Sequence, residues 1–262
     1  MAGSRSEASE AIRSGKVTVS GRPAAKAGML VAPEDAIGLA RSARRFVSRG
    51  GEKLEAALDR MGVEVAGRVA LDAGASTGGF TDCLLSRGAA HVIAVDVGYG
   101  QLDWRLREDP RVTVMERTNA RELRPDSVPN PDVVTADLSF ISLALALPSL
   151  VGVSAPEADF VLLVKPQFEA GRSHAEGGVV RDPATWHWVI GSVARVAEDL
   201  GLEVRGVMPS PLKGPAGNVE FFLYARRAGA GAHDSKRSTD RGVRLAIDRA
   251  VEEAKGLVSI HG

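Results

Sequence analysis

Residues 46–227 alternate short runs of apolar, often β-branched residues with stretches of helical periodicity, and no other feature constrains the fold as much. Each apolar run has the length of a buried strand. Strands that alternate with helices are typical of a mainly parallel sheet covered on both faces. We therefore predict an α/β fold with a doubly wound, Rossmann-like sheet of seven strands.

The predicted elements follow one another in a regular order. The strands are expected at Val69–Asp72, His91–Asp96, Val112–Glu116, Asp132–Ala136, Phe160–Lys165, Glu203–Met208 and Glu220–Ala225. The helices are expected at about Phe80–Arg87, Ile141–Leu150 and Pro183–Leu200. Pro183 suits the first turn of the last helix and Gly201 suits its end.

Two shorter segments flank this region. Residues 1–45 are polar and basic, and they predict a helix at Ser6–Ser14 and a hairpin that turns at Ser20-Gly21. Residues 228–262 open with a linker-like composition, and they predict an amphipathic helix at Val243–Lys255. We therefore divide the chain into residues 1–45, 46–227 and 228–262.

Composition excludes several classes of protein. Cys83 is the single cysteine of the sequence, so neither a disulfide framework nor a cysteine-built zinc site can form, and we expect a buried thiol and no metal. No stretch approaches the roughly 20 uninterrupted apolar residues of a membrane-spanning helix. The first 30 residues carry charges throughout, unlike a signal peptide. We expect a cytoplasmic protein that does not act on membranes.

Charge is balanced over the whole chain but not locally. The 33 basic and 33 acidic residues give a net charge of zero. Residues 1–60 hold 11 basic and 7 acidic residues, and residues 41–49 hold four arginines and no acid. A local basic face is typical of phosphate contact. A solvated linker would show the same pattern, so charge alone leaves both interpretations open.

The sequence LDAGASTGGF joins the first predicted strand to its helix. Its glycines let the backbone approach a ligand closely, but their spacing matches neither the dinucleotide-binding fingerprint nor a P-loop. S-adenosylmethionine suits such a loop because it carries no phosphate and presents an amino-acid moiety and a sulfonium. We expect it to be the cofactor, held by Gly74, Ser76, Thr77, Gly78, Gly79 and Phe80.

Polar residues at the ends of neighbouring strands extend the cofactor prediction. Asp72 ends the first strand, and its charge suits the amino group of the cofactor. Asp96 ends the second strand, where a carboxylate can accept hydrogen bonds from both ribose hydroxyls of an adenosine; the alternative is that Asp96 caps a turn. Asn119 and Ala120 follow the third strand, where we expect the adenine edge, and Asp137, after the fourth strand, is also expected to contact the cofactor.

Four charged residues are expected outside the carboxyl ends of the strands, where this fold places its site. They are Lys53, Asp137, Lys165 and Glu220. A lysine that ends an apolar strand is unfavourable unless it is paired or functional. A lysine acting as a base near neutral pH needs a pKa below its ordinary value of about 10.4, and burial or a second cation lowers it whereas a carboxylate raises it.

If the acceptor of the methyl group is a ribose hydroxyl, as the family resemblance described below implies, the four charged residues take different roles. Lys165 is the candidate base, and Asp137 would orient it. Lys53 and Glu220 would flank the acceptor ribose. A structural ion pair is the alternative for each residue taken singly.

Eight motifs carry a resemblance to a known family. In chain order they are FVSRGGEKL, LDAGASTGGFTDCLL, VDVGYGQL, RTNAREL, ADLSFISL, LVKPQFE, GGVVRDP and SPLKGPAGNVEFF. With them the chain resembles the TlyA family of FtsJ-like bacterial ribosomal RNA 2′-O-methyltransferases, some of which are called hemolysins. The resemblance implies the S-adenosylmethionine-dependent methyltransferase fold and cytidines of 16S and 23S ribosomal RNA as substrates. It also implies a catalytic set that falls on Lys53, Asp137, Lys165 and Glu220.

The amino-terminal segment adds a second resemblance. SRSEASEAIRSGKVTVSGRPAAKAG is similar to the second half of a ribosomal-protein-like RNA-binding module that the family carries, and the module's first helix has no counterpart here. RSARRFV is similar to the family's interdomain linker. The resemblance implies that this linker couples RNA binding to cofactor binding, so Arg44, Arg45 and Phe46 are the candidate residues for this coupling. The expected RNA contacts are Arg5, Arg13, Lys16, Arg44, Arg45 and Arg49. The family's chains usually end soon after the seventh strand, so we expect residues 228–262 to be an extension.

Two other functions remain open. A membrane-active hemolysin would fit the second family name, although the sequence has neither long apolar segments nor alternating membrane strands. A cofactor-retaining RNA-binding protein without catalysis would keep the glycine loop. Binding of S-adenosylmethionine separates the hemolysin from the other two functions, and methyl transfer to ribosomal subunits separates an enzyme from a binding protein.

Overall fold

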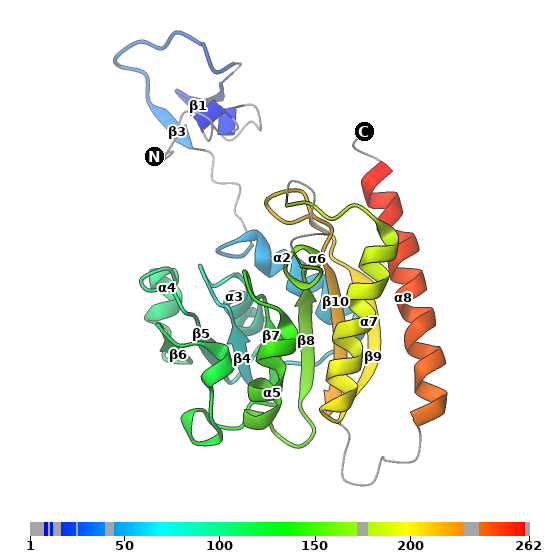
Figure 1. Ribbon diagram of the computed structural model, residues 1–262. Coiled ribbons are helices and arrows are strands. Elements are labelled where there is room, and N and C mark those ends of the chain that lie inside the picture. Colours follow the sequence, from blue (N-terminus) through cyan, green and yellow to red (C-terminus); the bar gives the residue numbers. More distant parts are fainter. Residues whose placement is uncertain are drawn as a thin grey trace. The chain divides into compact units, whose positions relative to one another are not determined.

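The protein is described by a computed structural model in which residues 8–9, 11–12, 17–24, 26–39, 45–171, 178–227 and 236–259 are placed (Figure 1). Contacts within the chain divide it into two compact units, Met1–Arg45 and Phe46–Gly262. Within these described ranges, no helix is long and apolar enough to cross a membrane.

The amino-terminal unit contains a small antiparallel sheet. Strand β1 (Val17–Val19) pairs with β2 (Arg22–Pro23) through a turn at Ser20 and Gly21, whose φ angles of 46° and 80° are left-handed. The predicted hairpin is therefore confirmed. Strand β3 (Ile37–Leu39) pairs with the other edge of β1 and was not predicted, because three residues are too short to show alternation. Residues 8–9 and 11–12 are helical, and the rest of the predicted helix Ser6–Ser14 lies outside the described residues.

The second unit is built on a seven-stranded sheet in the order β6-β5-β4-β7-β8-β10-β9. Its strands are β4 (Val69–Ala73), β5 (His91–Val95), β6 (Val112–Met115), β7 (Val133–Ala136), β8 (Asp159–Val164), β9 (Leu202–Pro209) and β10 (Phe221–Arg227). All seven predicted strands are confirmed, with ends that differ by one or two residues.

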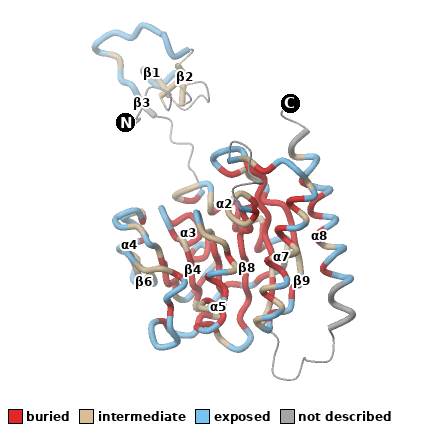
Figure 2. The backbone as a smooth tube through the Cα atoms, viewed as in Figure 1, coloured by how far each residue is buried: buried red, intermediate tan, exposed pale blue. Residues whose placement is uncertain are grey.

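Helices cover both faces of this sheet, as the doubly wound prediction requires (Figure 1). The helices are α2 (Arg49–Met61), α3 (Gly79–Ser86), α4 (Trp104–Arg107), α5 (Leu143–Val153), α6 (Pro166–Glu169), α7 (Pro183–Asp199) and α8 (Lys236–Ser259), with 3-10 turns η1 (Ala120–Glu122) and η2 (Pro125–Ser127). One core cluster joins the sheet to α5, α7 and α8, and a second joins the opposite face to α2, α3 and α4. The central strands are buried on both faces (Figure 2).

Strand β10 is antiparallel to both of its neighbours. It therefore contributes residues to the edge of the sheet at which the parallel strands have their carboxyl ends, which we call the functional edge. It pairs antiparallel with both β8 and β9. Its first residue, Phe221, lies opposite Val164, the last residue of β8. The residues just before β10 therefore reach the same edge as the residues just after β8, which brings Glu220 beside Lys165.

Two helices depart from the sequence prediction. Helix α2 was not predicted, although Leu54, Ala57 and Leu58 are buried at helical spacing and Gly62 ends the helix in a left-handed conformation with φ 64°. Helix α8 is longer than the predicted Val243–Lys255 and takes in part of the expected linker. It packs against α7 and β9 and covers an edge of the sheet, which protects that edge from pairing with other chains.

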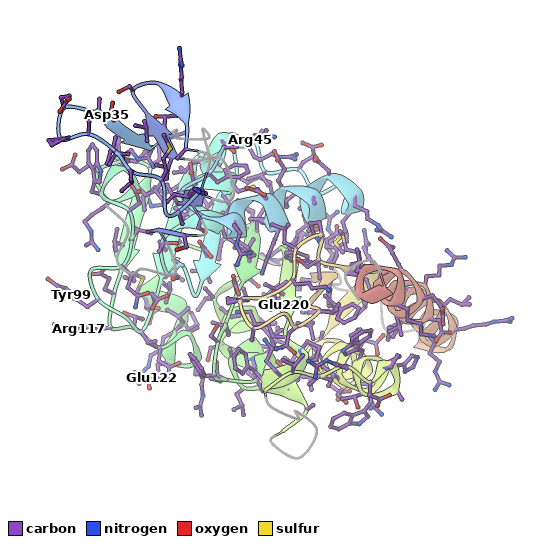
Figure 3. The ribbon with its side chains drawn as sticks, turned by 90° about the horizontal axis from the view of Figure 1, so that it is seen from above. Asp35, Arg45, Tyr99, Arg117, Glu122 and Glu220 are labelled. Atoms are coloured by element: carbon purple, nitrogen blue, oxygen red, sulfur yellow. The ribbon has the colours of Figure 1, made fainter. Side chains whose placement is uncertain are left out.

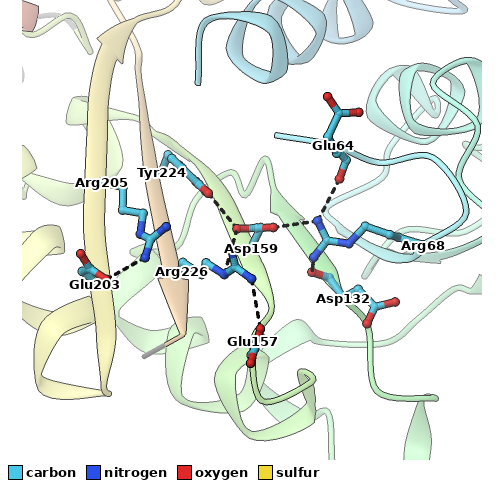
Figure 4. A network of polar contacts seen from close by, with 9 residues as sticks. All are labelled: Glu64, Arg68, Asp132, Glu157, Asp159, Glu203, Arg205, Tyr224 and Arg226. Atoms are coloured by element: carbon cyan, nitrogen blue, oxygen red, sulfur yellow. Dashed lines mark hydrogen bonds and ion pairs between the residues drawn. The ribbon is translucent and has the colours of Figure 1, made fainter. Parts of the chain in front are cut away.

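A polar network lies at the end of the sheet that is opposite the functional edge (Figure 4). Asp159 is buried, and its carboxylate accepts hydrogen bonds from Arg68 at 2.7 Å and from the Tyr224 hydroxyl at 2.8 Å. Burial and the Asp159 carboxylate raise the pKa of Tyr224. The network connects the start of β4 to β8 and β10, so it stabilises the strand order far from the functional edge.

Candidate active site

Two adjoining cavities open at the carboxyl ends of the parallel strands. The larger has a volume of about 560 Å³ and the smaller about 420 Å³. Both are lined by Gly74, Ser76, Asp137, Ser139 and Phe140, so they meet at the loops that follow β4 and β7. Figure 3 looks onto this edge and labels Glu220 near its centre. An open α/β sheet binds its ligands at this edge.

The glycine loop forms the wall between the two cavities. Gly74 has a φ of 87°, and a Cβ atom there would lie 2.6 Å from the carbonyl oxygen of Asp137. A side chain at this position would therefore push apart the loops that follow β4 and β7. Ser76, Thr77, Gly79 and Phe80 also line the larger cavity, as predicted for the loop.

Gly78 has a different task from the one predicted. It lines neither cavity, and a Cβ atom there would meet the side chains of Leu106 at 2.3 Å and Leu102 at 2.8 Å. Its φ of 96° and its missing side chain let the segment around α4 pack directly against the loop. Gly78 therefore shapes the loop from behind rather than from the ligand side.

The smaller cavity gathers the residues predicted to hold an adenosine. Asp96, Asn119 and Ala120 all line it. The Asp96 carboxylate accepts hydrogen bonds from the amides of Ser76 at 2.8 Å and Gly98 at 2.6 Å. Asp96 therefore caps its own turn and also faces the cavity, so the two interpretations of the sequence are compatible.

Asp72 lies behind the glycine loop and lines neither cavity. It is fully buried, and its Oδ2 atom accepts a hydrogen bond from the Thr81 hydroxyl at 2.7 Å. Burial raises the pKa of Asp72 to about 7, against the lowering effect of Thr81. The direct contact with the cofactor amino group predicted for Asp72 has no support in this geometry.

Replacing Asp72 tests this burial through the pH dependence of stability. The folded pKa of about 7 lies above the unfolded value of 3.8, so the stabilising contribution is complete below pH 3.8 and is lost as pH rises through 7. We expect Asp72→Asn to stabilise the cofactor-free protein at pH 8 by about 1–3 kcal/mol, and by less at pH 5. Urea unfolding at both pH values measures the difference, and equal effects at the two values would contradict the assignment.

The four predicted catalytic residues lie together in the larger cavity. Lys165 Nζ lies 2.5 Å from Asp137 Oδ1 and donates a hydrogen bond to Ser139 Oγ at 2.9 Å. It also lies 5.8 Å from the centre of the Phe168 ring. An ion pair with Asp137 and a hydrogen bond to Ser139, both from the loop after β7, thus fix the direction of an amine that follows β8.

The second charged pair of the cavity joins residues that are far apart in sequence. Lys53 Nζ lies 2.6 Å from Glu220 Oε2, and the two residues are 7% and 1% exposed. Gly214 makes room for this pair, because a Cβ atom there would lie 2.4 Å from Glu220 Oε1. Lys53 thereby neutralises the buried Glu220 carboxylate in the same cavity as the pair of Lys165 with Asp137.

Sequence reasoning missed Phe140 and Asn218. Phe140 is 92% exposed at the rim shared by both cavities, has a φ of 65°, and packs against Phe168 with ring centres 5.1 Å apart. Asn218 is buried in the larger cavity. Its side chain accepts a hydrogen bond from the Val180 amide and donates one to the Gly178 carbonyl, so it joins two loops. The polar and aromatic residues inside ADLSFISL were the available signal for Phe140.

The predicted RNA-binding residues are described only in part. Arg49 is exposed, begins α2 and lines the larger cavity. Arg45 is exposed, and Phe46, beside it in the linker motif, is buried against Gly51. Arg5, Arg13, Lys16 and Arg44 lie outside the described residues. Among the described residues, no group of three or more histidine, cysteine or acidic side chains gathers as a metal site.

Comparison with known proteins agrees with this geometry. Residues 46–227 match the FtsJ-like methyltransferase family, and residues 1–37 match the S4 domain. The solved structure of a hemolysin-named protein from Streptococcus thermophilus superimposes with a TM-score of 0.76 at 36% identity, covering 98% of this chain and 93% of that one. An S-adenosylmethionine-dependent methyltransferase structure from Listeria monocytogenes shares the fold, with a TM-score of 0.52, 15% identity, and 68% and 98% coverage.

The match to a named relative extends over nearly the whole chain. The 16S/23S rRNA (cytidine-2′-O)-methyltransferase TlyA of Mycobacterium tuberculosis is 52% identical over 97% of this chain and 94% of its own length. This alignment takes in most of residues 228–262, which lie beyond the part of the chain that matches the methyltransferase family. The chain therefore belongs to the FtsJ-like methyltransferase family, within its TlyA group.

Proposed function

We propose that the protein transfers the methyl group of S-adenosylmethionine to the ribose 2′-hydroxyl of cytidines in 16S and 23S ribosomal RNA. The observation that carries the proposal is the ion pair of Lys165 with Asp137, because Asp137 lines both cavities and Lys165 lines the larger. A cofactor with its adenosine half in the smaller cavity and its amino-acid half reaching past Gly74 into the larger cavity would meet a ribose in the larger cavity at this pair. The name of the mycobacterial relative supports the choice of cytidine and of both subunits.

The smaller cavity suits the adenosine half of the cofactor. Asp96 can accept hydrogen bonds from ribose hydroxyls, and Asn119 and Ala120 would border the adenine. The loop residues Gly74, Ser76, Thr77, Gly79 and Phe80 would border the amino-acid half. Gly74 lets this loop lie directly against the loop that carries Asp137, because a Cβ atom there would lie 2.6 Å from the Asp137 carbonyl oxygen. When bound, the cofactor supplies an activated methyl group on a sulfonium.

The larger cavity provides the groups that the acceptor oxygen needs. We assign Lys165, in its neutral amine form, as the base that removes the hydroxyl proton while the oxygen attacks the methyl group. The ammonium group that pairs with Asp137 must therefore lose a proton to solvent before the step. Asp137 and Ser139 hold its amine in one direction. Lys53 and Glu220 are assigned to the flank of the acceptor ribose, where their paired charges keep the cavity polar without a net charge.

Access to a ribose inside structured RNA requires an exposed nucleotide. Phe140 offers an exposed aromatic face at the rim of the larger cavity, and aromatic faces stack on unpaired bases. Arg49 adds a positive charge at the same cavity. We assign the S4-matching residues, including Arg5, Arg13 and Lys16, to contact with the surrounding ribosomal RNA, in a protein that works in the cytoplasm without metal or membrane.

This assignment divides the chain by task. Residues 1–45 would bind RNA, and residues 46–227 would bind the cofactor and catalyse transfer. Residues 228–262 would serve the second region, because α8 packs on its sheet.

The linker arginines give a prediction about RNA affinity. We expect Arg44→Ala combined with Arg45→Ala to weaken RNA binding and to lower the slope of log affinity against log salt by roughly 1 to 2, since each phosphate contact contributes about 0.7–0.9 to that slope. Filter binding to ribosomal subunits at several salt concentrations from about 50 to 200 mM measures this slope. Arg241→Ala with Arg249→Ala removes the same charge from exposed positions on α8 and should leave the slope unchanged. An equal slope for the linker variant would exclude phosphate contact by the linker.

The proposed function is tested by transfer of a tritiated methyl group from S-adenosylmethionine to ribosomal subunits that lack the modification. We expect incorporation into both subunits, at cytidine 2′-hydroxyls that mapping of the modified RNA identifies. Cofactor binding without incorporation would instead indicate an RNA-binding protein without catalysis. Absence of both, together with lysis of erythrocytes, would indicate the membrane-active alternative.

A further inference from the structure

Three carboxylates lie at the ends of the adjacent strands β4, β5 and β7. They differ in how far hydrogen bonds and ion pairs stabilise their negative charge. Asp96 accepts hydrogen bonds from two backbone amides, and Asp137 forms an ion pair with Lys165, although its Oδ1 atom has no hydrogen-bond partner among the described residues. Asp72 accepts a hydrogen bond from the Thr81 hydroxyl, and its other oxygen, Oδ1, is buried without a hydrogen-bond partner among the described residues. Asp72 is therefore the least compensated of the three.

The charged neighbours of Asp72 add to this imbalance. From the adjacent strands, Asp137 and Asp96 both disfavour a second negative charge, and α3 contributes the neutral Thr81. The lysines of the larger cavity, Lys53 on α2 and Lys165 after β8, are already paired with carboxylates. Burial and this acidic surrounding raise the pKa of Asp72 to about 7, so its charge state changes near neutral pH.

The position of Asp72 couples its charge to the cofactor cavities. It lies two residues before Gly74, which lines both cavities, and it is separated from them by the glycine loop rather than by solvent. Charges interact more strongly across a buried layer than through water. A cation in the cavities would therefore favour the ionised form of Asp72, and an uncharged ligand in its place would not.

We propose that Asp72 sets the charge preference of the cofactor site: it holds a proton when the site is empty, releases it when the methyl donor with its net positive charge binds, and thereby favours the donor over its zwitterionic product, whose net charge is zero. This inference rests on the proposed function. Transfer would form a bond between the ribose oxygen and the methyl carbon and break the bond of that carbon to sulfur, so the donor would lose its sulfonium charge. Lys165, as a neutral amine, would take the hydroxyl proton and pass it to solvent. The positive charge that kept Asp72 ionised disappears, so Asp72 takes up a proton again and product release is favoured.

The inference predicts a pH-dependent selectivity. As pH rises from 6 to 8, the ratio of affinities for S-adenosylmethionine over S-adenosylhomocysteine should rise, by up to about tenfold for each unit by which the bound cation lowers the pKa of Asp72. Asp72→Asn mimics the protonated form at every pH, so in this variant the ratio should stay constant apart from the titration of the ligands themselves. Both proteins experience that ligand titration equally, and their difference isolates Asp72.

The test is isothermal titration of the full chain with each ligand at three pH values, in buffers of different ionisation enthalpy. The wild-type protein should release more protons on binding the donor than Asp72→Asn does, and this difference should be smaller with the product. Thr81→Val removes the hydrogen bond that lowers the pKa of Asp72, so it should move the transition in selectivity to higher pH. This second variant keeps the test decisive if Asp72→Asn does not fold.

The outcomes separate the two levels of the argument. Failure of the wild-type protein to bind S-adenosylmethionine at any pH would overturn the proposed function itself. Binding of the donor with a proton release that is unchanged in Asp72→Asn, or a selectivity ratio that does not vary with pH in the wild-type protein, would overturn the role of Asp72 alone.

Discussion

Lys165→Ala should reduce methyl transfer by at least about 1000-fold while leaving affinity for S-adenosylmethionine within a few-fold of the wild-type value. Removal of a general base lowers the rate by about 100- to 10,000-fold. The upper part of this range is expected because Lys165 is oriented by an ion pair with Asp137 at 2.5 Å and a hydrogen bond to Ser139 at 2.9 Å. Among the described residues that line the cavity, Lys53 is the other amine, and it is paired with Glu220.

Single-turnover methylation of ribosomal subunits and calorimetric titration with the cofactor measure the two quantities separately. Lys255→Ala provides a matched control, because this lysine pairs with Glu252 on the exposed side of α8 and should keep full activity. Full transfer by Lys165→Ala would exclude Lys165 as the base. Parallel losses of transfer and of cofactor affinity would assign it to cofactor binding instead.

Breaking the Lys53–Glu220 pair should have the largest effect on stability. Either single replacement, Lys53→Met or Glu220→Leu, leaves a buried charge without its partner, and such a change destabilises a protein by about 3–5 kcal/mol. The double replacement removes both charges and should recover most of this loss, since apolar residues of similar volume often replace a buried pair without loss of stability.

Activity distinguishes a catalytic from a structural role for the pair. If Lys53 and Glu220 flank the acceptor ribose, the double variant should fold and bind cofactor but transfer methyl groups at less than about one hundredth of the wild-type rate. Chemical unfolding of all four proteins of the cycle gives the coupling energy. Wild-type transfer by the stable double variant would show that the pair serves the fold alone.

The sequence by itself determined the features that depend on local pattern. The period of the apolar runs predicted all seven strands of the sheet, because strand and helix place their apolar residues at different spacings. The positions of Gly74, Asp137 and Lys165 followed from the same pattern, since a residue at the carboxyl end of a parallel strand reaches the functional edge wherever the strand stands in the sheet. The glycine spacing also excluded a phosphate-binding loop.

The tertiary structure decided the features that depend on distant partners. Lys53 and Glu220 are 167 residues apart. They meet because α2, which the glycine-rich SRGGEKL did not predict, and the antiparallel strand β10 both begin at the same cavity. The burial of Asp72 behind its loop and the exposure of Phe140 at the rim were equally hidden, because a sequence shows which residue ends a strand but not which side of the next loop its side chain occupies. Burial and charge pairing arise from the packing of segments that are distant in sequence, so they became visible only in the folded chain.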